Sequence, residues 1–184
     1  MKFTETPLNG AYILDVVKHE DDRGFFARQF CINELADHDL ESQLVQCNIS
    51  FNHKKGTFRG MHFQRAPHAE DKIVSCTQGA ILDIIVDLRQ GSETFKQWTA
   101  VELSAENHRM LYVPKGFAHG FLTLKDDTVV YYQMTEFFHP ESAGGFRWND
   151  EAFDIMLPAP IEVISDRDAT YTAWKQEEAS FVHG

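Results

Sequence analysis

Residues 56–64 read G-T-F-R-G-M-H-F-Q, an apolar run that carries one arginine, Arg59, and one histidine, His62. Successive side chains on a strand point to opposite faces, so these two can serve one pocket only if the strand bulges. Gly60 lies between them and is the expected place for a bulge. The stretch alone allows two interpretations. One is a histidine base with a cationic helper, and the commoner one is a buried, hydrogen-bonded histidine beside a solvated arginine.

The segments on either side of this stretch are mostly short apolar runs separated by turn residues. Residues 71–77 and 80–88 are expected to be two strands joined at Gln78-Gly79. The second would place Leu82, Ile84, Val86 and Leu88 on one face, and Ile81, Asp83, Ile85 and Asp87 on the other. Further strands are expected at 11–17, 25–30, 44–52, 98–103, 109–113, 117–124 and 128–138, and short helices at 32–40 and 166–178. This pattern predicts an all-β sandwich or barrel in a single domain, residues 1–184.

Composition narrows the classes of partner. The chain has 184 residues, 43% of them hydrophobic, with 15 Phe, which indicates a folded core. Its net charge of −11 argues against binding to nucleic acid or to an anionic membrane, because both require a basic surface. A local cluster of Arg and Lys could still hold a small anionic ligand.

The spacing of the cysteines and the length of the apolar runs indicate the cellular compartment in which the protein is expected. Cys31, Cys47 and Cys76 are widely spaced and form no C-x-x-C pair, which fits a reducing compartment rather than a disulfide framework. The N-terminal residues have no apolar run of signal-peptide length, and no run is long enough to span a bilayer. We therefore expect a cytoplasmic protein with no membrane partner.

Residues 114–119, P-K-G-F-A-H, resemble the second motif of the cupin superfamily, in which a turn delivers a histidine to the start of a strand. The first cupin motif usually supplies H-x-H and a glutamate as metal ligands. Here that place reads His62-Phe63-Gln64, and glutamine is a poor ligand. His62 and His119 alone would leave a metal under-coordinated, so no metal is expected at this site. A metal-dependent cupin remains as an alternative.

An ordered set of motifs covers nearly the whole chain: D-D-R-G-F-F (21–26), Q-C-N-I-S (46–50), K-G-T-F-R-G-M-H-F-Q (55–64), D-K-I-V (71–74), I-V-D-L-R (85–89), V-E-L-S-A-E-N (101–107), P-K-G-F-A-H-G-F (114–121) and S-D-R-D (165–168). Together they resemble the dTDP-4-dehydrorhamnose 3,5-epimerase family. The resemblance implies a cupin-type jelly-roll β-barrel with a few short helices, mainly C-terminal, and a helical tail at 165–184. It also implies a homodimer that exchanges N-terminal strands (1–30).

The same resemblance implies a chemistry without a cofactor, a step of dTDP-rhamnose biosynthesis. The C–H bonds at carbons 3 and 5 of a 4-keto nucleotide sugar are acidified by the neighbouring carbonyl. His62 matches the family's base, Asp168 the carboxylate that orients it, and Tyr132 the acid on the opposite face of the sugar. Lys72 matches the cation near the developing oxyanion. On sequence grounds alone, an edge lysine, a core tyrosine and a helix-capping aspartate are the commoner fates of these residue types.

The resemblance also assigns residues to substrate binding. The assigned residues are Arg23 and Arg59 as diphosphate clamps, Gln46 and Asn48 as polar ligands, Phe138 as the stacking ring, His119 as a second cationic helper, Arg167, and Asp83. An even spacing places Phe138 on the strand face of Tyr132. Asp83 lies among isoleucines and needs a partner. It could anchor His119 or His62, or form a structural salt bridge.

The sequence departs from the family pattern at five positions: Arg28, Cys47, Gln133, Ala143 and Arg167. These changes are predicted to fall mainly among ligand contacts, whereas the proton-transfer set is intact. The substrate could therefore be a CDP- or GDP-linked sugar, or inversion could occur at one carbon only. A non-catalytic binder of sugar nucleotides is a third possibility. If the N-terminal strands are exchanged, Arg23 is expected to serve the pocket of a partner subunit.

Overall fold

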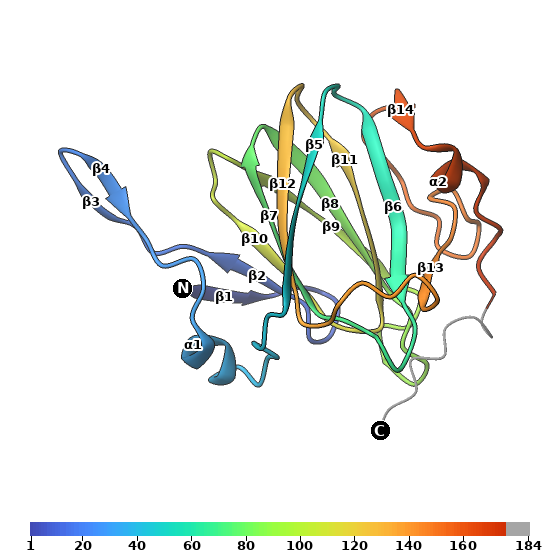
Figure 1. Ribbon diagram of the computed structural model, residues 1–184, viewed down its shortest axis with the longest axis horizontal. Coiled ribbons are helices and arrows are strands. Elements are labelled where there is room, and N and C mark those ends of the chain that lie inside the picture. The colour runs from blue at the N-terminus through green and yellow to red at the C-terminus, as the bar shows by residue number, and fades with distance from the viewer. Residues whose placement is uncertain (176–184) are drawn as a thin grey trace.

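The computed structural model describes residues 1–175, and within them two six-stranded sheets pack face to face as a jelly-roll barrel, as predicted (Figure 1). The first sheet has the order β1 (Lys2–Glu5), β2 (Tyr12–Asp15), β10 (Met110–Val113), β7 (Lys72–Gln78), β12 (Thr128–Met134) and β5 (Gln46–Asn52). The second has the order β13 (Ala143–Gly145), β6 (Thr57–Gln64), β11 (Phe117–Thr123), β8 (Ala80–Asp87) and β9 (Trp98–Ser104), with β14 (Val163–Ile164) parallel to β6.

The strand β8 has two buried faces, and this organises the core. Ile81 and Ile85 pack between the two sheets. Ile84 and Val86 pack on the outer side of the second sheet, under the C-terminal segment that includes Phe146 and Phe153. Each buried aliphatic side chain contributes about 1.5–3 kcal/mol of transfer free energy, so both layers stabilise the sheet. The division of this strand into two apolar faces is confirmed.

The two helices are shorter than expected. The helix α1 spans Ile32–Ala36, and α2 spans Asp166–Thr170, where the Oγ of Ser165 accepts a hydrogen bond from the amide of Asp168 at 3.1 Å. The first ends early because Asp39 adopts a positive φ of 56°, and the second because Tyr171 has extended backbone angles. Residues 176–178 of the expected second helix lie outside the described residues. The expected strands at 25–30 and 128–138 also end early, at Phe26 and Met134.

The predicted bulge in β6 is present. His62 pairs with His119 on β11, but Arg59 pairs with Phe121, so β6 holds one extra residue between the two pairs. Gly60 adopts φ 141°, and a Cβ added to it would lie 2.6 Å from the Cα of Gly120. Only glycine fits this close approach of two backbones. The bulge turns Arg59 and His62 toward the same side of the strand.

The N-terminal region leaves the barrel and returns to it. A hairpin of β3 (His19–Asp21) and β4 (Gly24–Phe26) projects away from the two sheets (Figure 1). At its tip the Nε of Arg23 donates to Oδ1 of Asp21 at 3.1 Å. This hairpin carries Phe26, which is 75% exposed. Such an apolar side chain on a projecting element is unusual unless another surface covers it.

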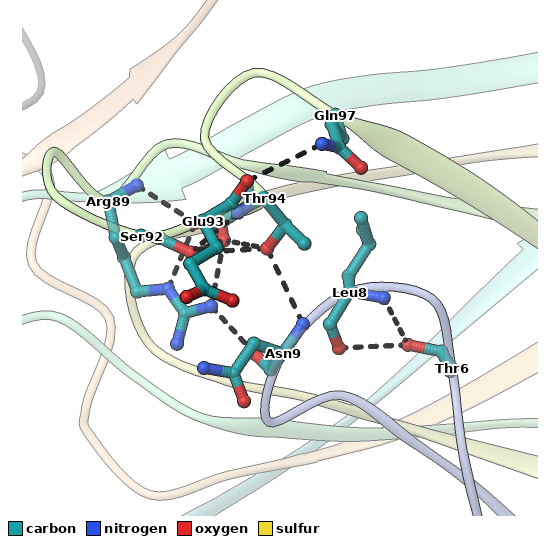
Figure 2. A network of polar contacts seen from close by, with 9 residues as sticks. Thr6, Leu8, Asn9, Arg89, Ser92, Glu93, Thr94 and Gln97 are labelled. Atoms are coloured by element: carbon teal, nitrogen blue, oxygen red, sulfur yellow. Dashed lines mark hydrogen bonds and ion pairs between the residues drawn. The ribbon is translucent and has the colours of Figure 1, made fainter.

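A polar network ties the turn before β2 to the loop after β8 (Figure 2). The guanidinium of Arg89 donates to the carbonyl of Asn9 at 2.6 Å, and the amide of Asn9 donates to Oγ1 of Thr94 at 3.4 Å. The buried carboxylate of Asp87 accepts from Arg89, Ser92 and Thr94 at 2.6–2.9 Å. Burial raises the pKa of Asp87, but the hydrogen bonds from these three residues outweigh it and leave the pKa below its usual value.

Candidate active site

A cavity of about 610 Å³ opens between the two sheets, a size suited to a small organic ligand. Nine of the predicted site residues line it: Gln46, Asn48, Arg59, His62, Lys72, His119, Tyr132, Phe138 and Arg167. They come from β5, β6, β7, β11, β12, the loop after β12 and helix α2. Two further predicted residues, Asp83 and Asp168, lie behind the cavity wall and contact it through histidines.

A histidine–aspartate pair forms one wall of the cavity. Nε2 of His62 lies 2.7 Å from Oδ1 of Asp168, and the amide of Gly60 donates to Oδ2 of Asp168 at 3.2 Å. Burial raises the pKa of Asp168. The hydrogen bond with His62 and the charge of that ring lower the pKa by more, so the net shift is downward. An ionised carboxylate at Nε2 leaves Nδ1 of His62 as the basic nitrogen. The bulge at Gly60 therefore places both the histidine and its anchor.

Tyr132 lies on the other side of the cavity. It belongs to β12 of the first sheet, whereas His62 belongs to β6 of the second sheet. Tyr132 is half-buried against the core between the sheets, and Asn48 stands opposite it on β5. An imidazole and a phenol thus face one cavity from opposite sheets. This is the spatial requirement for removing a proton from one face of a ring and supplying one to the other.

Lys72 is buried rather than solvated, because β7 lies inside the first sheet between β10 and β12. Its Nζ lies 2.7 Å from Oε1 of Glu70, and both side chains are largely shielded from water. An ion pair of this kind fixes the position of the ammonium group. Glu70 lines the cavity and was missed from the sequence, where only its place two residues before a matched lysine could have singled it out.

The partner of Asp83 is His119. Nε2 of His119 lies 2.7 Å from Oδ1 of Asp83, which has no exposed surface. The sequence left open whether Asp83 would anchor His119, anchor His62 or form a salt bridge. The geometry selects His119, and His62 is held by Asp168 instead. Arg59 is oriented differently, since its Nε donates to Oδ1 of Asn52 at 2.8 Å.

Gln46, Asn48 and Phe138, the residues predicted to contact a nucleotide, all line the cavity, but the position of Phe138 requires one correction. The side chain of Gln46 accepts a hydrogen bond from the amide of Phe138 at 3.1 Å and lies 3.3 Å from Asn48. Phe138 does not share a strand face with Tyr132, because β12 ends at Met134 and the chain then leaves the sheet. It reaches the cavity from the loop, with a half-exposed ring.

Gln64 was considered only as a poor metal ligand, and its structural role was not predicted. Its Nε2 donates to the carbonyls of His68 and Phe137 at 2.9 and 3.1 Å and to Oε2 of Glu70 at 2.7 Å. Its Oε1 accepts from the amide of His139 at 2.6 Å. One buried amide therefore joins the two loops at the rim of the cavity. A polar residue in an apolar strand was the available signal.

Arg23 does not line the cavity of its own chain, because it lies at the tip of the projecting hairpin. The departures from the family pattern were expected mainly among ligand contacts, and for Cys47 and Gln133 this is wrong. Cys47 and Gln133 stand opposite each other on β5 and β12, and neither lines the cavity. Arg28 forms an ion pair with Glu34 at 2.6 Å. The other two departures, Ala143 and Arg167, do line the cavity.

The comparison with known proteins covers nearly the whole chain. Residues 5–176 match the family model described as dTDP-4-dehydrorhamnose 3,5-epimerase. The curated dTDP-4-dehydrorhamnose 3,5-epimerase of Escherichia coli is 44% identical over 167 residues, covering 89% of this chain and 89% of that protein.

Solved structures agree in fold. The crystal structure of dTDP-4-dehydrorhamnose 3,5-epimerase from Elizabethkingia anophelis has a TM-score of 0.93 at 38% identity, covering 97% of this chain and 98% of that one. A Legionella pneumophila dTDP-6-deoxy-D-glucose-3,5-epimerase, solved in complex with dTDP-4-keto-L-rhamnose, has a TM-score of 0.91 at 32% identity over 100% and 99% of the two chains. Among the described residues, no helix is long and apolar enough to cross a membrane.

Proposed function

Because the chain belongs to the dTDP-4-dehydrorhamnose 3,5-epimerase family, we propose that it inverts carbons 3 and 5 of a dTDP-linked 4-keto-6-deoxy sugar, with His62 as base and Tyr132 as acid. The observation that carries this proposal is the placement of the two side chains in one cavity but on opposite sheets. A site that only bound the sugar would not need an acid and a base on opposite faces of it.

The proposed reaction is a proton transfer that conserves all atoms of the substrate. Nδ1 of His62 removes the hydrogen on a carbon next to the keto group as a proton. The electron pair of the broken C–H bond forms the carbon–carbon double bond of an enolate, and the π pair of the carbonyl moves onto its oxygen. Tyr132 then gives its phenolic proton to the same carbon from the other face, and the pair of the enolate returns to form the new C–H bond. Exchange with solvent restores both side chains.

The enolate oxygen needs positive charge or hydrogen-bond donors nearby. Lys72 supplies an ammonium group that Glu70 holds in place at 2.7 Å. His119 lines the same cavity with its Nε2 at the buried Asp83, and as an imidazolium it would donate from Nδ1 and add a second positive charge. The anchoring carboxylates keep these donors fixed before the substrate arrives, so little reorganisation is required during the reaction.

The nucleotide end is proposed to lie along β5 and the loop after β12. Gln46 and Asn48 offer amide groups, Arg59 and Arg167 offer positive charge for the diphosphate, and Phe138 offers an exposed ring face for the base. Arg167 lies beside Asp168 on α2, so the helix that orients the base would also contact the substrate.

We propose a cytoplasmic homodimer of one-domain subunits, in which residues 1–30 pack against the partner. The hairpin of β3 and β4 has an exposed Phe26, and the edge strand β5 has Ile49, which is 74% exposed, and Phe51, both at the border of the cavity. Covering one apolar surface with the other would remove both from water. In that arrangement Arg23 is free to reach the partner's cavity. The exposed thiol of Cys47 fits a reducing compartment.

Incubation with dTDP-4-keto-6-deoxyglucose in heavy water tests the proposal by proton NMR. The signals of the hydrogens on carbons 3 and 5 should disappear, and His62→Ala should abolish their loss. The same assay with CDP-, UDP- and GDP-linked 4-keto sugars tests the choice of nucleotide. Exchange at one carbon would limit the activity to single inversion, and saturable binding without exchange would overturn the catalytic assignment. Activity lost on chelation would favour a metal-dependent cupin.

A further inference from the structure

A cluster of two histidines and one glutamate lies at the rim of the cavity, outside the proposed catalytic set. His68 belongs to the loop after β6, and Glu136 and His139 belong to the loop after β12. Nδ1 of His68 lies 4.0 Å from Oε2 of Glu136, and Nε2 of His139 lies 3.8 Å from Oε1 of the same carboxylate. Within residues 1–175 this is the one group of three His, Cys, Asp or Glu side chains whose ligand atoms all lie within 4.8 Å of one another.

A second carboxylate orients one of the imidazoles. Oε1 of Glu141 lies 3.1 Å from Nδ1 of His139. A carboxylate at one ring nitrogen holds the proton there and leaves the lone pair on the other, which here is the Nε2 that faces Glu136. Histidines that bind metals in proteins are typically held in this way, by a carboxylate or carbonyl at the far nitrogen. The pairing of Glu141 with His139 is thus an observation independent of the three-residue cluster.

The backbone under the cluster is fixed by Gln64. This side chain, 4% exposed, donates to the carbonyl of His68 and accepts from the amide of His139, at 2.9 and 2.6 Å. It also donates to the carbonyl of Phe137, the neighbour of Glu136. The two loops that supply the three ligands are therefore already held together by hydrogen bonds, so that little backbone ordering would remain to be done on binding.

The two imidazoles need only a change of ring orientation. They stack with centroids 3.5 Å apart and planes within 9° of parallel. A shared metal must lie in the plane of both rings, so the ring of His68 has to turn out of this stack while Glu141 keeps its hold on His139. Their side chains are 28% and 29% exposed, which leaves room for that rotation.

We propose that His68, Glu136 and His139 bind a divalent transition-metal ion of the zinc class, with water completing a tetrahedral shell. Two imidazoles and one carboxylate form a ligand set that suits zinc and its neighbours rather than magnesium or calcium. The ion would join the loop that carries Glu70 to the loop that carries Phe138, both of which line the cavity. Its role is to stabilise the rim; the proton transfers proposed above do not pass through it.

Titration of the purified, chelator-treated full-length protein with zinc and with cobalt(II) tests this site. We expect one equivalent of metal per chain, a tetrahedral cobalt(II) absorption spectrum, and a rise in Tm of about 5–10 °C at a zinc concentration 100 times Kd. His68→Ala and His139→Ala should lose the cobalt spectrum and the rise in Tm. Glu141→Gln should weaken binding about 10–100-fold, because it removes the group that orients His139.

His53→Ala is the matched control, since His53 is exposed and belongs to the turn between β5 and β6, and it should bind metal as the unchanged protein does. Equal binding by His68→Ala, His139→Ala and the unchanged protein would overturn the proposal, as would an octahedral cobalt spectrum or no binding at all. Circular dichroism of the metal-free variants establishes that they fold. Deuterium exchange in the presence of chelator should be retained, which separates this site from the catalytic one.

Discussion

The carboxylate of Asp168 reaches the imidazole of His62 across 106 residues of sequence, with Oδ1 at 2.7 Å from Nε2. The amide of Gly60 holds the other carboxylate oxygen, and the hydroxyl of Ser165 caps the short helix that carries Asp168. The bulge in β6 and the short helix α2 thus together fix the position of His62. The basic nitrogen of that histidine is set by a residue that does not line the cavity.

We expect Asp168→Asn to lower kcat about 10²–10⁴-fold, because the amide can no longer stabilise the imidazolium formed when His62 takes a proton. KM should change far less, since Asp168 does not line the cavity. Steady-state kinetics with the dTDP-linked keto sugar check this. An equal loss in Asp168→Asn and in Ser165→Ala, with normal folding of both, would indicate a helix-placing role instead.

Tyr132→Phe should separate exchange from inversion. The base on the opposite sheet remains, so hydrogen removed by His62 can return from the same side and carry solvent deuterium with it. Inverted product should fall by about 10²–10⁴-fold, the usual contribution of a positioned acid. Proton NMR in heavy water distinguishes deuterated starting sugar from epimer.

Tyr131→Phe is the matched control for this variant, since Tyr131 directly precedes Tyr132 on β12 and does not line the cavity. It should exchange and invert at the rate of the unchanged protein. Loss of inversion in both variants, or in neither, would contradict the assignment of Tyr132 as the acid.

Gly60→Ala should destabilise the fold by about 2–4 kcal/mol, from strain at φ 141° together with overpacking against Gly120. Gly91→Ala provides the comparison, because Gly91 also has a positive φ, 93°, but a Cβ there meets nothing within 4 Å. It should cost only about 1 kcal/mol. Urea unfolding of the two variants measures the difference, and equal midpoints would show that the close approach of β6 to β11 is not what requires glycine.

Acid should destabilise the protein partly through Asp87. Burial raises its pKa, but its hydrogen bonds lower it more, so the folded pKa is below the unfolded one. The stabilisation is therefore fully present above the unfolded value of about 3.9 and is lost as pH falls through the folded value. Asp87→Asn should lower the free energy of unfolding by about 1–3 kcal/mol at pH 7 and show a smaller loss below pH 4. Urea unfolding at both pH values checks this.

Much of the fold could be predicted from the sequence, because it follows from local features such as the alternation of apolar residues and the positions of glycines. The alternation along β8 gave both core layers, and the glycine between Arg59 and His62 located the bulge. The partner of Asp83 could not be predicted, since two histidines were equally plausible until the register of β8 and β11 was known. The same holds for Cys47 and Gln133, which pair with each other on β5 and β12 and do not line the cavity, whereas the adjacent pair Asn48 and Tyr132 does.

The loop residues were the least predictable part of the site. Phe138 continues an apolar run that favours a strand, but the chain leaves the sheet at Met134, where Thr135 contacts the buried Asp71 instead. Gln64 acts through contacts with a loop that lies far away in the sequence, since it bonds to Phe137 and His139. No local pattern encodes such contacts, because each depends on where the other loop ends.

The placement of His62 and Tyr132 on facing sheets means that aliphatic packing sets the gap between them. Facing sheets stand roughly 10 Å apart, a spacing fixed by the volume of the side chains enclosed between them. Val130, two residues before Tyr132 and fully buried in that layer, touches no substrate group in the proposed mechanism. A change in the volume of this side chain would nonetheless widen or narrow the active site. The apolar core between the two sheets therefore sets the distance between the proposed base and the proposed acid.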